Sequence, residues 1–217
     1  MLVFDFFSGT GSSTQAFREA GDTVIGFEID ASFNPEVIAD INDLNASELL
    51  RTYGRPDFIW ASPPCTTFSV ASIGHHWLRG GSNPLPKTKE AADALVMVLN
   101  LRRLIEELNP KYGFLIENPR GMMRKIAPMQ DLDRVTITYC QYGDTRQKPT
   151  DLWGWLPNWN PRPTCKPKSD CHESAPRGSR TGTQGLGNAK DRSRIAPELG
   201  HELRAALAVE LAEDSPR

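Results

Sequence analysis

Two short segments of the chain place reactive side chains at the ends of apolar runs. Cys65 follows Pro63 and Pro64, and Glu117 follows the apolar run 114–116. The prolines restrict the backbone before the cysteine, so its sulfur can be presented at a fixed angle to a bound molecule. A thiol and a carboxyl group held in this way can serve as a nucleophile and an acid. A plain turn with a half-buried thiol would leave the same local pattern, so the rest of the chain must decide.

The N-terminal segment predicts a nucleotide-binding turn. An apolar start leads through Phe7, Gly9 and Gly11 into a helical pattern, which is the strand, glycine turn and helix order of nucleotide-binding folds. Glu28 ends the next apolar run, at about the twenty-residue offset where an acid can hold ribose hydroxyls. Asp40 repeats this arrangement one strand later, although either acid could instead cap a helix or lie in a solvated loop.

The elements that must position these groups alternate along the chain. Apolar runs predict strands near 2–6, 23–28, 37–40, 57–61, 113–117 and 134–140. A long helix is expected from Lys89 to Leu108, ending at Asn109-Pro110. Its expected buried residues are Ala92, Leu95, Val96, Leu99 and Leu104. A four-residue spacing predicts one apolar face on a later helix, formed by Leu199, Leu203, Leu207 and Leu211.

These motifs, in this order, resemble those of the DNA cytosine-5 methyltransferases. The opening at Phe7 resembles the family's S-adenosylmethionine loop, Glu28 its ribose ligand, and Asp40 the residue that reads the adenine edge. The resemblance implies an α/β, Rossmann-like S-adenosylmethionine-dependent methyltransferase fold, with a mostly parallel sheet and helices on both faces. The implied cofactor-binding residues are Phe7, Gly9, Gly11, Glu28, Ile29, Asp40, Ile41 and Pro63.

The reactive segments resemble motifs of the same family. Pro63-Pro64-Cys65 is similar to the nucleophile motif and Glu117-Asn118 to the base-holding motif, with Pro119 where the family usually has valine. The stretch 142–148 resembles a further motif that carries a base-contacting arginine, and either Arg146 or Lys148 does that arginine's work. The implied catalytic residues are Cys65, Glu117, Arg146 and Lys148.

The resemblance spans residues 1 to about 150 and about 190 to 212. The segment 195–199 and the helix after it are similar to the last family motif, which closes the cofactor pocket. We therefore expect a catalytic and cofactor-binding core at 1–153, a short target-recognition insert at 154–191, and a returning helix at 192–217. The insert has too few apolar residues for a core of its own.

Methyl transfer to carbon 5 of cytosine in DNA agrees with these residue types. Cytosine C5 is a poor nucleophile, so a thiolate must first add at C6, for which Cys65 is the candidate. Glu117 could donate a hydrogen bond to N3 of the base. The target base must be flipped out of a duplex or already unpaired, and the stretch 66–86 is expected to close over it. The adjacent His75 and His76 in this stretch are expected to be solvated residues and not metal ligands.

Basic residues gather where the family has its target-recognition region. They suggest a local DNA-binding surface, although a solvated flexible segment would look the same. Because so small an insert can hold few base contacts, short or relaxed sequence specificity is expected. The basic residues are Arg162, Lys166, Lys168, Arg177, Arg180, Lys190, Arg192 and Arg194, of which Arg177, Arg180 and Arg192 are the expected phosphate contacts.

Composition favours a soluble, cytoplasmic monomer. The 217 residues carry a net charge of -2, and 39% are hydrophobic, with neither a membrane-spanning run nor a signal peptide. The four cysteines are expected to be free thiols. Cys165, Cys171 and His172 lie close together, and Cys140 could complete a zinc site. The five-residue gap between the two cysteines is wider than usual zinc-knuckle spacings, so no metal is expected.

Three other functions share parts of this pattern. The substrate could be cytosine in RNA or a free nucleotide, and the Ser-Pro-Pro turn is also similar to amino-methyltransferases, which need an aromatic residue where Cys65 stands. A cofactor-binding regulatory module with a decayed site is the alternative outside enzymes. Retention of both Cys65 and Glu117 argues against decay. The family resemblance also implies base flipping and a restriction–modification setting.

Overall fold

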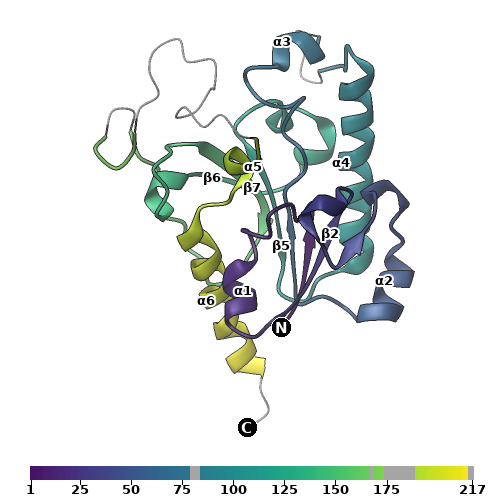
Figure 1. Ribbon diagram of the computed structural model, residues 1–217, viewed down its shortest axis with the longest axis vertical. Coiled ribbons are helices and arrows are strands. Elements are labelled where there is room, and N and C mark those ends of the chain that lie inside the picture. The colour runs from purple at the N-terminus through teal and green to yellow at the C-terminus, as the bar shows by residue number, and fades with distance from the viewer. Residues whose placement is uncertain (79–83, 167–168, 174–188, 215–217) are drawn as a thin grey trace.

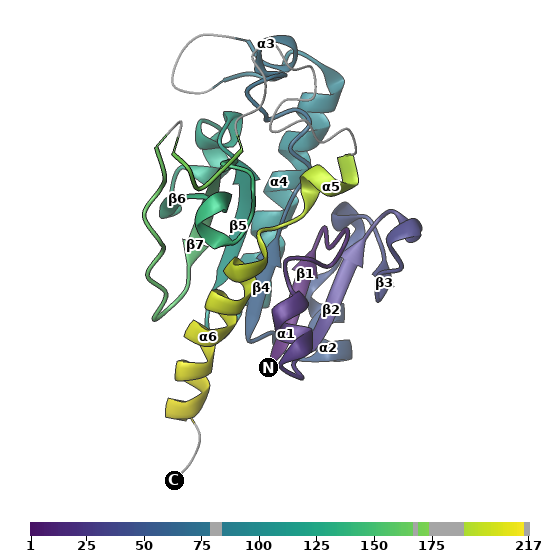
Figure 2. The ribbon, with the colours of Figure 1, turned by 60° about the vertical axis from the view of Figure 1, so that its left-hand side comes forward.

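The structure is a computed structural model that describes residues 1–78, 84–166, 169–173 and 189–214. A seven-stranded sheet runs through the middle, and helices cover both of its faces (Figures 1 and 2). The strands are β1 (Leu2–Phe6), β2 (Thr23–Glu28), β3 (Val37–Ile38), β4 (Phe58–Ala61), β5 (Phe114–Pro119), β6 (Arg134–Thr138) and β7 (Pro149–Trp155). The α-helices are α1 (Gln15–Glu19), α2 (Ala46–Tyr53), α3 (Ile73–His76), α4 (Lys89–Leu108), α5 (Ala189–Ser193) and α6 (Pro197–Asp214). Short 3₁₀ helices span Ala31–Phe33, Ile41–Asp43, Met122–Arg124, Ala127–Met129 and Tyr139–Tyr142.

The strand order brings the predicted motifs to one edge of the sheet. The order is β3-β2-β1-β4-β5-β7-β6, with parallel neighbours except that β7 runs antiparallel to β5 and β6. Phe6 of β1 pairs with Phe27 and Ala61, and Ala61 pairs with Ile116 of β5. The glycine turn follows β1, the Cys65 segment follows β4, and Glu117 lies in β5 just beyond its last pair with β4. They therefore share the carboxyl edge, where open α/β sheets bind their ligands.

Both faces of the sheet are buried. Phe4 and Ile59 pack beneath α2 and α4 on one face, and Val3 and Trp60 pack beneath α1 and α6 on the other. Figure 2 shows the same two layers from a second direction. Because alternate residues of β1 and β4 point to opposite covered faces, these strands are apolar almost throughout.

Most of the predicted elements are confirmed. All six expected strands are present as β1 to β6, although β3 is shortened to Val37–Ile38. The leucine face of α6 is confirmed as well, since Leu199, Leu203 and Leu207 are fully buried and Leu211 is partly buried.

The expected buried face of α4 is wrong. Leu104 is buried and Ala92 and Leu95 are half-buried, but Val96 and Leu99 are 52% and 49% exposed. The first half of the helix is apolar nearly all round, so its pattern selects no single face. The second half alternates apolar and charged pairs, and that half sets the register. The residues buried on α4 are Ala91, Val98, Leu101, Leu104, Ile105 and Leu108.

Strand β7 was not predicted from the sequence. It begins at Pro149, and 150–153 are all buried, so no polar alternation marks it. Its buried Asp151 is held by an ion pair with the Arg124 guanidinium, which offsets the cost of an acid in an inner strand. The strand continues to Trp155, past the core boundary expected at residue 153.

Asp5, on the central strand β1, holds the glycine turn in place. The carboxylate is fully buried, and its Oδ2 accepts hydrogen bonds from the hydroxyls of Ser13 at 2.8 Å and Thr14 at 2.7 Å. Burial raises the pKa of Asp5 from 3.8 to about 6, because the two hydroxyl donors offset only part of the lost solvation.

This raised pKa predicts a specific pH dependence of stability. Between about pH 6 and pH 4 the folded chain binds a proton at Asp5 that the unfolded chain has not yet taken up, so stability from this group increases as the pH falls. Relative to Asp5→Asn, the wild-type protein should gain about 1 kcal/mol in unfolding free energy between about pH 7.5 and pH 5. Urea unfolding of both proteins at the two pH values measures this difference. A constant difference, or one that shrinks at low pH, would contradict the assignment.

Candidate active site

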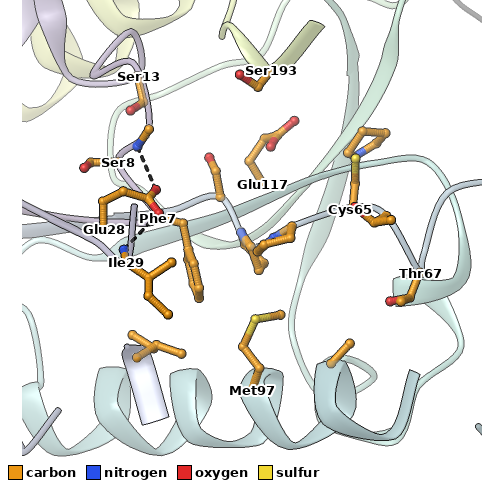
Figure 3. Close-up of a pocket in the computed structure, with 18 of the residues that line it drawn as sticks. Phe7, Ser8, Ser13, Glu28, Ile29, Cys65, Thr67, Met97, Glu117 and Ser193 are labelled. Atoms are coloured by element: carbon orange, nitrogen blue, oxygen red, sulfur yellow. Dashed lines mark hydrogen bonds between the residues drawn. The ribbon is translucent and has the colours of Figure 1, made fainter. Parts of the chain in front are cut away.

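A cavity of about 1390 Å³ opens along the carboxyl edge of the sheet. Pockets for one small ligand span roughly 300–1,000 Å³, so this cavity has room for two. Its walls include the glycine turn, Glu28, Cys65, Glu117 and the segment 192–195. Figure 3 shows Cys65 and Glu117 together in one part of the cavity and Glu28 in another, with α4 forming the opposite wall.

The turn that carries Cys65 is fixed from both sides. The Ser62 N–H donates to the Phe6 carbonyl at 3.1 Å, which continues the β1–β4 pairing beyond the strand. The Asn118 side-chain amide donates to the Pro63 carbonyl at 2.8 Å and ties this turn to the end of β5. The Cys65 carbonyl accepts from Ser69 at 2.9 Å, so the residues after the cysteine form a tight turn. Cys65 is a half-buried free thiol that lines the cavity.

The segment after Cys65 has buried anchors. The Phe68 and Trp77 rings lie 5.8 Å apart and are both buried, and the Phe68 carbonyl accepts from the Met122 N–H at 2.7 Å. At Gly121 a Cβ would lie 2.1 Å from that carbonyl, so only glycine allows this approach. His76 bonds to Thr88 through Nδ1 at 2.8 Å. The role of 66–86 as a closing loop stays a prediction, and its residues 79–83 lie outside the described part of the chain.

Glu117 is buried beside two further polar groups. The Tyr139 hydroxyl donates to Glu117 Oε1 at 3.0 Å, and Lys148 Nζ lies 3.8 Å from the same oxygen. Burial and the nearby Glu117 raise the pKa of Tyr139 well above its ordinary value, so the phenol stays a donor. Tyr139 was not among the residues predicted from the sequence. Its signal was a tyrosine directly after strand β6, which ends at the same edge of the sheet.

Arg146 and Lys148 occupy different positions. Lys148 lines the cavity, and its ammonium group lies 4.4 Å from the centre of the Tyr139 ring. The guanidinium of Arg146 is buried and pairs with Asp144. It also donates to the backbone carbonyls of Asp191, Arg192 and Arg194, at 3.3, 3.0 and 2.9 Å. The cavity therefore contains Lys148, while Arg146 anchors the returning segment behind it.

Burial and the neighbouring charges together raise the pKa of the Cys65 thiol. Burial raises the pKa of Cys65 above 9.0, and the Glu117 carboxylate adds to this effect. Lys148 and Arg192 act in the opposite direction because their positive charges favour a thiolate. Burial also lowers the pKa of Lys148, and Glu117 partly restores it. The charges of Glu117 and Lys148 therefore act on the Cys65 thiol in opposite directions.

The other part of the cavity suits an adenosyl group. Glu28 accepts backbone hydrogen bonds from Gly9 at 3.1 Å, Ile29 at 2.9 Å and Asp30 at 3.2 Å, which fixes its carboxylate beside the glycine turn (Figure 3). Ile29 is 63% exposed, so an apolar surface lies uncovered next to an acceptor for hydroxyl groups. Asp40 caps a 3₁₀ helix through the Asn42 N–H, the alternative its sequence position allowed, and it lines the cavity too.

The remaining predicted cofactor residues fall in the same place. Gly9 and Gly11 have φ of +47° and +68°, values that favour glycine in this turn. Phe7, Gly9, Ile41 and Pro63 line the cavity, and Gly11 stands between the lining residues Thr10 and Ser12.

The predicted basic surface is only partly described. Arg162 forms ion pairs with Glu198 and Glu202 of α6 at 2.6 and 2.5 Å, so it ties the segment after β7 to that helix. Arg192 lines the cavity. Lys168, Arg177 and Arg180 lie outside the described residues. Among the helices that are described, none is long and apolar enough to cross a membrane.

The sheet order and this cavity define the S-adenosylmethionine-dependent methyltransferase fold. A methyltransferase from Entamoeba histolytica shares it, with a TM-score of 0.52 at 16% identity over 74% of this chain and 54% of that one. The chain thus spans about half the length of that solved relative. S-adenosylmethionine is the cofactor, and the exposed Ile29 beside Glu28 fits its adenosyl group.

The sequence comparisons give the family. The profile of the C-5 cytosine-specific DNA methylases matches residues 1–132, and the chain belongs to that family. A probable DNA (cytosine-5)-methyltransferase of Frog virus 3 (isolate Goorha) is 29% identical over 177 residues, which cover 79% of this chain and 78% of the viral protein. The family and fold expected from the sequence motifs are therefore confirmed.

The charge arrangement predicts opposite shifts in Cys65 reactivity for two substitutions. Glu117→Gln removes a charge that disfavours the thiolate, so alkylation of Cys65 by iodoacetamide should begin at lower pH than in the wild-type protein. Lys148→Met removes a favourable charge and should move the profile to higher pH. Mass spectrometry of the Cys65 peptide measures both profiles. Lys111→Met, at the opposite edge of the sheet, should leave the profile in place, and shifts of equal sign in the first two variants would contradict this coupling.

Proposed function

We propose that this protein transfers a methyl group from S-adenosylmethionine to carbon 5 of cytosine in DNA, through a covalent adduct with Cys65. The observation that carries the proposal is a single cavity that contains Cys65, Glu117 and Lys148 together with the glycine turn and Glu28. A DNA (cytosine-5)-methyltransferase is also what the viral relative is named, and the family profile supports the same substrate.

Cys65 is the nucleophile in this proposal. Its thiolate adds to C6 of the base, and the electron pair of the C5–C6 double bond becomes available at C5 as a proton is taken up at N3. The bound cofactor supplies a sulfonium methyl group to C5. Loss of the C5 proton and cleavage of the sulfur–C6 bond then restore both the aromatic ring and the thiolate. Lys148 supports the addition, because its positive charge lowers the pKa of Cys65.

Glu117 holds the base and donates the proton that N3 takes up. In the described part of the chain, Tyr139 and Lys148 both contact Oε1 of this carboxyl group, so we assign Oε2 to the base. Tyr139 is a positioning residue, since it acts by fixing Glu117. Arg146 is also a positioning residue, because it holds the segment that carries Arg192 against the cavity.

The cofactor-binding roles follow the cavity walls. Glu28 is assigned to the ribose hydroxyls and Ile29 to the adenine face. Asp40 and Ile41 are assigned to the adenine edge. Incubation with labelled S-adenosylmethionine and separate samples of DNA, RNA and free cytidine nucleotide tests the substrate class. Label in RNA or nucleotide alone would overturn the DNA assignment, and binding of cofactor without any transfer would favour a regulatory module.

The covalent mechanism predicts that DNA containing 5-fluorocytosine will trap the enzyme. Fluorine at C5 cannot leave as a proton does, so the Cys65–C6 bond should persist once methyl transfer has occurred. A denaturing gel should show the protein–DNA adduct in the presence of cofactor. Cys65→Ala should lose both the adduct and turnover.

Glu117→Gln provides the matched control for this experiment. It should slow methyl transfer by about a hundredfold or more, the usual scale for an acid–base group, and leave cofactor binding intact. Loss of cofactor binding in this variant would show that Glu117 is structural. If the Cys65→Ala variant still transferred the methyl group, the covalent mechanism would be contradicted.

Short or relaxed sequence specificity is the further part of the proposal. Each good base-reading pair contributes roughly 1–3 kcal/mol, and the segment 154–191 is too short to hold many such pairs rigidly. Phosphate contacts should therefore supply most of the affinity, so Arg177→Ala with Arg180→Ala should weaken binding equally across sequences and flatten its salt dependence. Titrations at several salt concentrations check this. Bisulfite mapping of methylation to one site of about six base pairs would contradict the size argument.

A further inference from the structure

Four metal-ligating side chains meet near the end of β6. They are Cys140, Cys165, Cys171 and His172, and their ligand atoms all lie within 4.8 Å of one another. Cys140 Sγ lies 3.2 Å from Cys165 Sγ and 3.7 Å from Cys171 Sγ. Nδ1 of His172 lies 3.7 Å from Cys165 Sγ and 3.6 Å from Cys171 Sγ.

Three of these four separations, at 3.6 to 3.7 Å, match those of a tetrahedral zinc shell, and the Cys140–Cys165 separation of 3.2 Å is shorter. Zinc–sulfur bonds of about 2.3 Å and zinc–nitrogen bonds of about 2.0 Å place neighbouring ligand atoms about 3.5 to 3.8 Å apart. A disulfide requires about 2.05 Å between sulfurs, whereas all four cysteines of the chain are free. Three thiolates and one imidazole form a Cys₃His set, which is a usual composition of closed, structural zinc sites.

The chain around these ligands has few apolar side chains and no described helix or strand to fix its conformation. Residues 164–173 contain no large apolar side chain, and no helix or strand is described between Trp155 and Ala189. Leu156 and Trp159 pack on the core before this stretch, but nothing comparable follows them within it. A short polar segment of this kind needs a covalent or metal crosslink to keep one conformation.

The surroundings also favour a metal. The Gln147 amide donates to Cys165 Sγ at 3.3 Å, a contact that stabilises a thiolate ligand and fixes its direction. The Cys165 N–H donates to the Thr138 hydroxyl at 3.0 Å, which ties the second ligand to the end of β6. Cys140 stands two residues beyond Thr138. The ligands therefore bring together the end of β6 and the polar segment.

We propose that Cys140, Cys165, Cys171 and His172 bind one structural zinc ion. The sequence argued against a metal because five residues separate Cys165 from Cys171, wider than a zinc knuckle. The fold removes that objection, because Cys140 comes from the end of β6 and completes the set from another part of the chain. This proposal replaces the expectation from the sequence that no metal is bound.

The zinc ion would lie next to the catalytic residues without touching substrate. Cys140 directly follows Tyr139, which fixes Glu117, and Gln147 directly precedes Lys148. The Glu173 N–H donates to the Thr145 carbonyl at 2.9 Å. The segment that would bind zinc therefore also contacts the loop between Tyr139 and Lys148. On the proposed DNA function, the site anchors the start of the segment that carries Arg177 and Arg180.

Metal analysis of the purified, tag-free protein tests the site directly. Inductively coupled plasma mass spectrometry should find about one zinc ion per chain. Replacement by cobalt should give the strong visible bands and the sulfur-to-cobalt charge transfer of a tetrahedral thiolate site. Cys171→Ser and His172→Ala should lose most of the metal. Cys65→Ala and His75→Ala, which remove the same residue types elsewhere, should keep it.

A second measurement uses the wild-type chain and does not depend on variants that fold. A chelator should lower the thermal unfolding midpoint, zinc should restore it, and magnesium should not. Alkylation of Cys140, Cys165 and Cys171 should be slow with zinc and fast after chelation. Equal alkylation with and without zinc, a Cys140–Cys165 disulfide in reduced protein, or full zinc content in the Cys171→Ser/His172→Ala double variant would overturn the proposal. Zinc content is independent of methylation, so an inactive protein with one zinc ion would refute only the proposed function.

Discussion

The hydrogen bond from the Asn118 amide to the Pro63 carbonyl is the contact on which the reactive geometry depends. The β4–β5 ladder pairs Ala61 with Ile116 and goes no further, so the Cys65 turn after β4 and Glu117 of β5 both lie beyond it. The 2.8 Å bond from Asn118 spans them where the ladder ends. Because Asn118 is fully buried, water does not compete for this bond. Cys65 and Glu117 are thus held by near neighbours in the chain, Pro63 and Asn118, that are hydrogen-bonded to each other.

The surroundings of Cys65 favour the protonated, less reactive form of its thiol. Glu117 and burial keep the thiol protonated, while Lys148 and Arg192 reduce the cost of ionising it. A protonated thiol reacts slowly with alkylating agents and oxidants, so this arrangement protects the Cys65 side chain. Tyr139 contributes to the same arrangement, since its neutral phenol satisfies one carboxylate oxygen without adding a charge.

The sequence predicted an element correctly where burial alone explains the spacing of its apolar residues. Strand apolarity and the Leu199–Leu211 spacing predicted elements correctly, because burial on one or two faces leaves a clear period. The face of α4 was wrong, since Val96 and Leu99 are as apolar as the residues that pack inside. Strand β7 was missed because its buried Asp151 depends on Arg124, a partner distant in sequence. The clustering of Cys140 with Cys165 likewise depends on tertiary structure.

The wall of the cofactor cavity joins residues far apart along the chain. The Ile195 N–H donates to the Ser12 hydroxyl at 3.0 Å, and Arg146 holds the carbonyls between Asp191 and Arg194. Contacts of such long range form late, because the entropy of closing the intervening loop must be overcome first. On the ribosome, a growing chain can therefore assemble β1, β2 and the glycine turn well before this wall exists. The cavity is therefore complete only after the C-terminal segment has packed, because Arg192, Ser193 and Ile195 form part of its lining.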